Sequence, residues 1–274
     1  MVAKRLAGGA AAIVVPAGSC SGAIAGGNDW AMRILILGGT EEARLLAERL
    51  VAMGHEVTTS LAGRTSDPLL PRGNVRVGGF GGADGLAGFL KAERIDRLVD
   101  ATHPYAAEIK AGAVKAAQLA EVRLVRLVRP AWHEPQYAFW KHVASPQEAA
   151  ASLPKGARVL LTVGHTHLEV YLARTDCSFV VRSIEPPEKP LPVNAAMLVA
   201  RPPFFLGGEL ALLQEQGISH LICKNSGGVQ TEAKLAAALQ LRLPVIMIAR
   251  PALPPAHEVP TVGQAIAALR LDRA

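Results

Sequence analysis

The chain has 274 residues, of which 50% are hydrophobic and 19% are charged, and its formal net charge is +6. This length and composition suffice for one large or two ordinary folded domains and exclude a disordered, collagen-like or linker chain, while an aromatic content of 4% argues against a stacking surface for single-stranded nucleic acid. The positive charge indicates an anionic partner, and because the basic residues are scattered, a small polyanionic ligand competes with nucleic acid for that role.

The first thirty-one residues differ from the rest of the chain, because they are rich in glycine, poor in charge and without helical or alternating period. Lys4 and Arg5, followed by the apolar stretch 6–15, imitate a secretion signal. That stretch is broken by glycines and is much shorter than the ~18 residues that a membrane span needs. We therefore predict that residues 1–31 are a disordered leader or follow a start codon assigned too far upstream.

From Arg33 onward, short β-branched or Leu-rich runs alternate with longer Ala-, Leu- and Glu-rich runs, which is typical of strands and helices in a parallel sheet. In the first half this pattern predicts strands at 34–37, 56–61, 75–77, 97–101 and 123–128, and helices at 40–52, 83–93 and 105–120. In the second half it predicts strands at 158–163, 179–183, 197–200, 220–224 and 245–248, and helices at 167–173, 208–216, 230–241 and 262–269.

An aperiodic, proline-containing stretch after Pro130 separates the two halves. The predicted organisation is a Rossmann-like NADP-binding domain at 32–130, a connection at 131–157 and a second Rossmann-like domain at 158–274. The fold class is therefore α/β, with two Rossmann-like parallel-sheet domains and a cleft between them. Ligands of such sheets bind outside the carboxyl ends of the strands, so function should lie in the strand-to-helix loops.

The first strand-to-helix loop, residues 38–43, reads GGTEEA. It has small residues at the three positions of a G-x-G-x-x-G/A turn, with a threonine for the second glycine and an alanine for the third. Glycines permit a tight turn, and the amides at the start of the next helix favour a pyrophosphate. A plain glycine turn is the alternative. The favoured interpretation is a nucleotide-binding turn made by Gly38, Gly39, Thr40 and Glu41, with Thr40 also capping the helix.

The end of the second predicted strand indicates which nucleotide binds. A fold that prefers NAD usually carries Asp or Glu about twenty residues after the first glycine, to bind the ribose 2′-hydroxyl. Residues 59–64 read TSLAGR instead, so Ser60 offers a hydroxyl and Arg64 a guanidinium. Because the guanidinium fork suits a phosphate dianion, we predict NADPH as the cofactor. A solvated surface arginine at position 64 is the alternative.

The loop after the fourth predicted strand, residues 100–106, reads DATHPYA. His103 can titrate near neutral pH and Tyr105 can donate a proton, so either could position a substrate or serve in catalysis. Thr102 and His103 are also candidate contacts of the cofactor. The structural alternative is that Asp100 or Thr102 caps the following helix and His103 packs at its mouth.

Two loops of the second half are candidates for substrate or anion binding. The first is a cationic, backbone-rich pocket formed by Lys224, Asn225, Ser226, Gly227 and Gly228. An ordinary turn with a lysine reaching solvent is the alternative. The second contains His165 and His167, which have neither the spacing nor a third ligand for a metal, so we predict no metal and consider His165 a substrate contact. Three cysteines without metal or disulfide spacing favour a reducing, cytoplasmic location.

Three of these segments resemble the precorrin-6A reductase family of cobalamin biosynthesis. Members carry L-G-G-T-x-E-[AG]-R, D-A-T-H-P-[YF]-A and K-N-S-G-G in this order, and the matching segments here are 37–44, 100–106 and 224–228. The resemblance covers residues 32 to about 270. One departure is RPPF at 201–204, where the family tends to have R-G-P-F. The proline at 202 removes one backbone amide that could contact a ligand. Arg201, next to it, is a further candidate substrate contact.

The resemblance implies two Rossmann-like domains with the active site between them, and hydride transfer from NADPH to C19 of precorrin-6A, giving precorrin-6B. A polycarboxylate tetrapyrrole substrate would account for the positive charge, and we predict neither a nucleic-acid partner nor a membrane partner. The sequence does not indicate an oligomeric state. The nicotinamide supplies the hydride, and His103, Tyr105 or solvent supplies a proton. The alternatives are a cobalt-precorrin-6A reductase using NADH, a non-catalytic NADP-sensing protein, and a transferase with two facing Rossmann-like units. Ser60 and Arg64 favour NADPH and the metal-free substrate.

Overall fold

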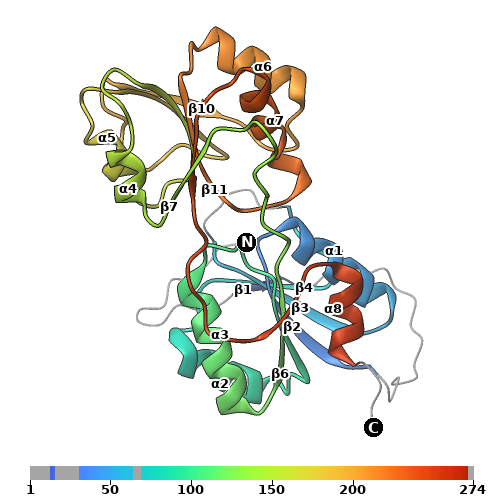
Figure 1. Cartoon of the computed structure of the whole chain (residues 1–274). Coiled ribbons are helices and arrows are strands. Elements are labelled where there is room, and N and C mark those ends of the chain that lie inside the picture. The colour runs from blue at the N-terminus through green and yellow to red at the C-terminus, as the bar shows by residue number, and fades with distance from the viewer. Residues whose placement is uncertain (1–12, 16–30, 64–68, 271–274) are drawn as a thin grey trace. The chain divides into compact units, whose positions relative to one another are not determined.

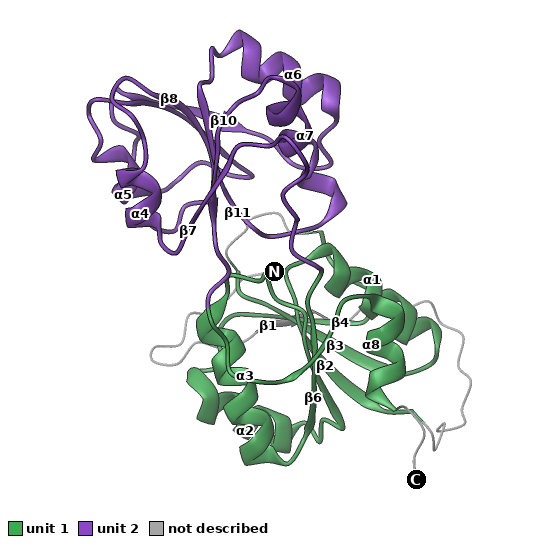
Figure 2. Cartoon of the chain, viewed as in Figure 1, with its two compact units in different colours: residues 1–129, 252–274 green, residues 130–251 purple. Residues whose placement is uncertain are grey.

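The computed structural model describes residues 13–15, 31–63 and 69–270 (Figure 1). The chain divides into unit 1, residues 1–129 with 252–274, and unit 2, residues 130–251 (Figure 2). The predicted leader lies outside the described residues except for Ala31 and residues 13–15, which form an unpredicted strand, β1 (Ile13–Val15). No helix in the described ranges is long and apolar enough to cross a bilayer.

Unit 1 is built on a sheet with the strand order β1-β4-β3-β2-β5-β6-β13. β1 pairs antiparallel with β4 at one edge, and the other six strands are parallel. Those six are β2 (Arg33–Leu37), β3 (Glu56–Leu61), β4 (Asn74–Val77), β5 (Arg97–Asp100), β6 (Arg123–Leu127) and β13 (His257–Val259). Numbered along the chain, the parallel strands follow the order 3-2-1-4-5-6 of dinucleotide-binding folds.

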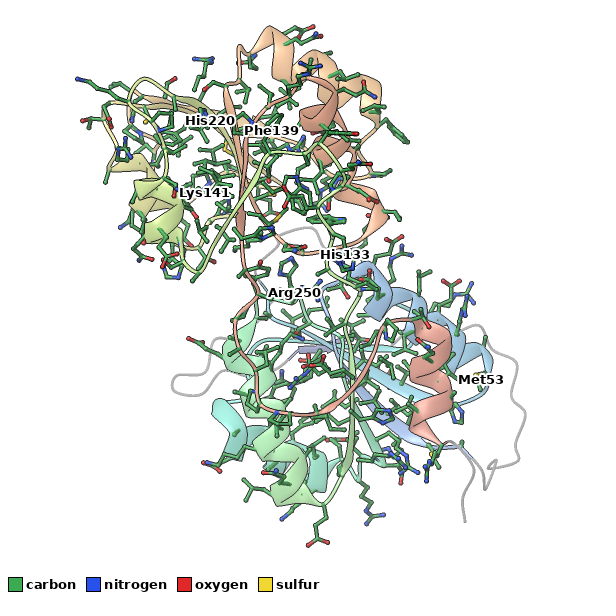
Figure 3. All side chains as sticks on the ribbon, viewed as in Figure 1. Met53, His133, Phe139, Lys141, His220 and Arg250 are labelled. Atoms are coloured by element: carbon green, nitrogen blue, oxygen red, sulfur yellow. The ribbon has the colours of Figure 1, made fainter. Side chains whose placement is uncertain are left out.

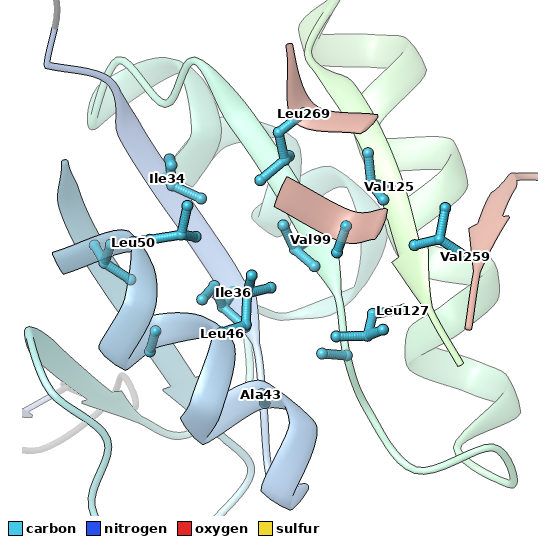
Figure 4. Packing of buried hydrophobic residues seen from close by; sticks show 14 of the residues in the cluster. Ile34, Ile36, Ala43, Leu46, Leu50, Val99, Val125, Leu127, Val259 and Leu269 are labelled. Atoms are coloured by element: carbon cyan, nitrogen blue, oxygen red, sulfur yellow. The ribbon is translucent and has the colours of Figure 1, made fainter. Parts of the chain in front are cut away.

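Helices cover both faces of this sheet, as Figure 1 shows. They are α1 (Glu41–Ala52), α2 (Gly82–Ala92), α3 (Ala107–Ala120) and α8 (Val262–Leu269). The central strand β2 is a continuous apolar run because alternate side chains pack on opposite faces. Ile34 and Ile36 pack in one cluster with residues of α1 and α8 (Figure 4). Leu35 and Leu37 pack in another with residues of α2 and α3.

Unit 2 contains six parallel strands in the order β10-β9-β8-β11-β12-β7. They are β7 (Trp140–Val143), β8 (Arg158–Thr162), β9 (Ser178–Ser183), β10 (Ala195–Val199), β11 (His220–Lys224) and β12 (Val245–Ile248). The helical segments are α4 (Pro146–Ala151), α5 (Leu168–Leu172), α6 (Leu206–Glu215), η1 (Val229–Thr231) and α7 (Ala233–Gln240). The predicted class, α/β with two Rossmann-like parallel sheets, is confirmed.

Unit 2 begins at Pro130, and the structure differs from the predicted domain organisation in two respects. Residues 131–157 are not a connection, because they contain β7 and α4, and β7 pairs with β12 of unit 2. The chain from 252 returns to unit 1, so the second unit does not extend over 158–274. The physical reason lies in unit 1: β13 pairs with β6, and Leu269 of α8 packs against the sheet face that α1 also covers.

Candidate functional site

The first turn of unit 1 lies at the carboxyl end of the central strand β2. Gly38 fits tightly, since its N–H donates to the Ser60 carbonyl at 2.8 Å and an added Cβ would lie 2.7 Å from Cγ2 of Thr59. Gly39 has a φ of +104°, which favours glycine. Thr40 caps α1 as predicted, because its Oγ1 accepts from the Ala43 N–H at 3.1 Å.

Thr40 also joins this turn to the loop that follows β5. Its hydroxyl donates to the Ala101 carbonyl at 2.8 Å. The turn is therefore fixed on one side to β3, through Gly38 and Ser60, and on the other side to the segment that carries Thr102 and His103. The structure thus gathers these predicted cofactor residues of unit 1 at one edge of the sheet, with Glu41 half-buried in the first turn of α1. Arg64 lies outside the described residues.

The predicted contact Ser60 is buried and has a partner that sequence reasoning missed. Arg76 of β4 lies opposite Ser60 in the sheet register, and its Nη1 donates to the Ser60 hydroxyl at 3.3 Å. The same guanidinium donates to the carbonyls of Gly78 and Gly79, each at 2.6 Å, and stacks over the Phe80 ring at 3.9 Å. Burial lowers the pKa of Arg76. Arg76 therefore holds Ser60 and the turn after β4 in one arrangement.

A buried charge cluster underlies the loop after β5. Asp100, Lys110 and Arg126 have side chains with no exposed surface. The Asp100 carboxylate accepts from Lys110 Nζ at 3.1 and 3.2 Å, and from Arg126 Nε at 3.1 Å. Arg126 also donates to the half-exposed Glu258 at 2.8 Å, so the two cations meet two carboxylates. Burial lowers the pKa of Lys110, and the charge of Asp100 opposes that shift.

The same carboxylate fixes the predicted cofactor residue Thr102. Asp100 Oδ1 accepts from the Thr102 hydroxyl at 2.7 Å and from its N–H at 3.2 Å. The helix that follows begins with Ala106 as N-cap and has no side-chain cap. The alternative in which Asp100 or Thr102 caps that helix is therefore wrong, because both side chains are directed into the cluster instead.

His103 and Tyr105 are neighbours in this loop. The Nδ1 of His103 accepts from the Tyr105 N–H at 3.3 Å, and the two rings lie 5.8 Å apart. A neutral imidazole that accepts at Nδ1 carries its proton at Nε2, so His103 can donate from that atom. Both side chains are half-buried. The structure therefore places the two predicted catalytic candidates side by side in the loop after β5.

In unit 2, the loop 224–228 is fastened to the start of the unit. The Asn225 amide accepts from the Trp132 N–H at 2.8 Å and donates to the Trp132 carbonyl at 3.1 Å. An added Cβ on Gly227 would lie 1.9 Å from the Pro130 carbonyl, and the φ of Gly227 is +69°. Arg250, labelled in Figure 3, donates to the carbonyls of Asn225 and Ser226 at 2.8 and 3.1 Å. The loop is thus fixed by contacts within unit 2. Lys224 is half-buried at the end of β11, and Gly228 has a φ of +89°.

The two other predicted substrate contacts follow the carboxyl ends of β8 and β10, which flank β9 in the unit 2 sheet. His165 follows β8, and its Nε2 lies 2.7 Å from both the Ser183 hydroxyl and the Glu185 carbonyl. Arg201 follows β10 and lies 3.8 Å from the Glu185 carboxylate. The Glu185 segment therefore brings these predicted residues together. No group of three or more metal-ligating side chains occurs among the residues that the structure describes.

Sequence reasoning missed several buried charges: Arg76, Lys110, Arg126, Arg182 and Glu209. The signal is a charged residue inside an apolar strand, as in LVRLV at 124–128 and FVVRS at 179–183. Such a charge in a strand buried on both faces requires a partner, so its presence indicates an ion pair, although the sequence does not identify the partner.

Comparison with known proteins places the whole arrangement in a family. The family model "Precorrin-6x reductase CbiJ/CobK" matches residues 33–270. A precorrin-6A reductase of Rhodococcus erythropolis is 48% identical over 86% of this chain and 96% of its own, and that of Mycobacterium tuberculosis is 44% identical over 81% and 90%. A cobalt-precorrin-6A reductase of Priestia megaterium is 30% identical over 80% and 90%.

A solved structure agrees with these sequence relatives. The structure titled "CobK precorrin-6A reductase" superimposes with a TM-score of 0.83 at 41% identity, over 87% of this chain and 96% of that one. The family model, the relatives and the fold therefore agree over nearly all the residues that the structure describes. This chain belongs to the precorrin-6x reductase CbiJ/CobK family.

Proposed function

We propose that this chain is an NADPH-dependent precorrin-6A reductase of cobalamin biosynthesis, which transfers a hydride to C19 of precorrin-6A and forms precorrin-6B. Relatives that are 43–48% identical carry the name precorrin-6A reductase, whereas those named for the cobalt-containing substrate are 30% identical. The observation that carries the proposal is the glycine turn at Gly38 and Gly39, on the first strand of a 3-2-1-4-5-6 sheet.

The fit to a dinucleotide is supported by the space around that turn. A Cβ added to Gly39 would meet no atom within 4 Å, so the turn has an open side, and Thr40 occupies only one of the amides at the start of α1. A pyrophosphate at this place would bind the remaining amides. For the 2′-phosphate of NADPH, the proposed contacts are Ser60, which Arg76 positions, and Arg64.

The chemistry of the reduction is divided between cofactor and protein. When bound, the reduced nicotinamide supplies the hydride. Thr102 and His103 are the proposed contacts near its ring, and the Asp100 carboxylate keeps Thr102 in place. A proton must also reach the product, and His103 Nε2 or the Tyr105 hydroxyl is the proposed source, with solvent as the alternative.

Unit 2 is the proposed site for the acidic groups of the substrate. Lys224, His165 and Arg201 supply cationic or donating side chains at the carboxyl edge of the sheet. The backbone of Ser226, Gly227 and Gly228 completes the proposed anion site. A substrate carrying many carboxylates is consistent with the net charge of +6, and the proposed location of the reaction is the cytoplasm.

The proposal is tested by following NADPH consumption with purified enzyme and fresh precorrin-6A. We expect oxidation of NADPH only when precorrin-6A is present, slower oxidation of NADH, and little turnover of cobalt-precorrin-6A. Absence of turnover with a verified substrate would refute the proposal. NADPH binding without any consumption would favour the NADP-sensing alternative, and tighter binding of a sugar nucleotide than of NADPH in calorimetry would favour a transferase.

A further inference from the structure

Several large apolar side chains are exposed at the carboxyl edge of the unit 2 sheet, and Phe205 and Val229 are the most exposed of them. Phe205, just before α6, is 73% exposed, and Val229, at the start of η1, is 81% exposed. The Phe204 N–H donates to the Gln230 carbonyl at 2.9 Å, so the two segments run side by side. Single exposed apolar residues are common on proteins, and exposure alone indicates nothing. The way in which Phe205 is held is more informative.

A buried ion pair fixes the turn that presents Phe205. The Arg182 guanidinium lies 4.1 Å from the centre of the Phe204 ring and donates to the Glu209 carboxylate in the first turn of α6. The side chains of Arg182 and Glu209 are only 5% and 3% exposed. Phe204 is therefore held by stacking and by its N–H, and the next residue is kept outward by a rigid support.

Phe205 also occupies a position where its side chain does not help the fold. It is the N-cap residue of α6, with extended backbone angles and no side-chain hydrogen bond. Elsewhere in the chain, Thr40, Ser145 and Thr261 cap helices through their hydroxyls. An aromatic ring at an N-cap leaves a helix amide without that partner and exposes apolar surface to water. Both effects are unfavourable in the free protein, and the exposure of apolar surface is relieved if a ligand covers the ring.

We propose that Phe205 and Val229 form an apolar ledge on which the ring face of the tetrapyrrole substrate lies. The inference rests on the proposed function, because the occupant is the precorrin-6A macrocycle. Such a ligand presents an apolar face surrounded by acetate and propionate groups, and therefore needs apolar surface and cations together. Two cations come from the same segments. Arg201 follows β10 and lies four residues before Phe205, and Lys224 ends β11 and lies five residues before Val229.

The ion pair that Arg201 makes is compatible with this role. Arg201 and Glu185 are 3.8 Å apart, with side chains 41% and 27% exposed. A long, partly exposed pair contributes little to stability, so a substrate carboxylate can replace Glu185 at small cost. The ledge would thus set the plane of the ring, and the cations would set its rotation within that plane.

The test compares Phe205→Ser with Phe139→Ser. Phe139 is 57% exposed and precedes β7, at the opposite edge of the same sheet, so it is a matched control (Figure 3). Precorrin-6A binding is measured by equilibrium dialysis without NADPH, and its KM by NADPH consumption. For Phe205→Ser we expect binding about tenfold weaker and KM raised to a similar degree, with NADPH affinity unchanged. Phe139→Ser should bind as the wild type does.

A second readout separates this role from a structural one. Because serine is a good N-cap, Phe205→Ser should raise the melting temperature while it weakens substrate binding. Phe205→Leu keeps the apolar surface and should bind within about threefold of wild type. Wild-type binding by Phe205→Ser, or equal loss in Phe139→Ser, would overturn the ledge. Failure of the wild-type enzyme to bind and reduce precorrin-6A would instead overturn the proposed function itself.

Discussion

Replacement of Asp100 by asparagine tests the buried charge cluster of unit 1. The change keeps the shape of the side chain and its hydrogen bond from Thr102 but removes the negative charge. Among the described residues, Lys110 and Arg126, each with no exposed side-chain surface, then retain Glu258 as their counter-charge, and its side chain is 52% exposed. Removing one partner of a buried pair costs about 3–5 kcal/mol, because an uncompensated charge stays in the interior. For a unit of this size we expect the melting temperature to fall by roughly 6–20 °C.

The loss of stability in Asp100→Asn should become smaller as pH rises. Burial lowers the pKa of Lys110 from its ordinary value of 10.5, and Asp100 limits that shift, so the pKa falls further in Asp100→Asn. Between the lowered pKa and the ordinary one, the unfolded chain binds more protons than the folded chain, so stability rises with pH. The stability deficit of the variant therefore narrows as pH rises through the lowered pKa of Lys110 towards its ordinary value of 10.5.

Thermal unfolding followed by circular dichroism at several pH values measures both effects. Asp84→Asn is the matched control, since Asp84 is in the same unit and its side chain is 78% exposed in a surface pair with Lys115. That variant should lose at most about 1 kcal/mol. If Asp100→Asn lost no more stability than Asp84→Asn, or if its deficit widened with rising pH, the assignment of Asp100 as the required counter-charge would be refuted.

Three further variants test other parts of the structure. Gly227→Ala should lower the melting temperature strongly, because the added Cβ would overlap the Pro130 carbonyl. In the control Gly263→Ala, in α8, the added Cβ meets no atom within 4 Å, and the free energy of unfolding should rise by up to about 1 kcal/mol. Equal effects of the two variants in thermal denaturation would contradict this. Thr40→Val removes two hydrogen bonds and should cost about 1–2 kcal/mol and weaken NADPH binding in calorimetry, with Thr40→Ser restoring both. Arg64→Ala should weaken NADPH far more than NADH in the same assay, and equal losses would count against a 2′-phosphate contact.

Much of the fold could be predicted because the chain encodes its elements locally. The run at 34–37 is apolar on both faces and precedes a glycine turn, so a buried parallel strand followed by a helix is the only reading that satisfies both signals. The prediction failed where an element is short and its partner is distant. β13 has three residues, two of them exposed, and its partner β6 lies more than a hundred residues earlier, so no local pattern identifies the sheet that it joins.

The candidate site was predictable to a similar extent. Thr40 has the residue type and position of a helix cap, and the structure shows that cap. Its second bond, to the Ala101 carbonyl, depends on the order of the strands and has no signature in the sequence. The same limit applies to Ser60, whose partner Arg76 is set by sheet register. The sequence therefore predicts contacts between residues that are close in the chain, whereas contacts with distant residues can be assigned only once the fold is known.

The return of the chain to unit 1 has a consequence for synthesis on the ribosome. Unit 2 is a single continuous stretch, residues 130–251, and all of it is translated before β13 and α8. Unit 1 lacks β13 and the helix that carries Leu269 into its core until residues 257–269 have been made. Residues 1–129 therefore cannot complete the core of unit 1 on their own, although domains usually mature from the N-terminus onward. A chain that ended near residue 251 would contain all of unit 2 but would leave β6 without the strand that pairs with it at the sheet edge.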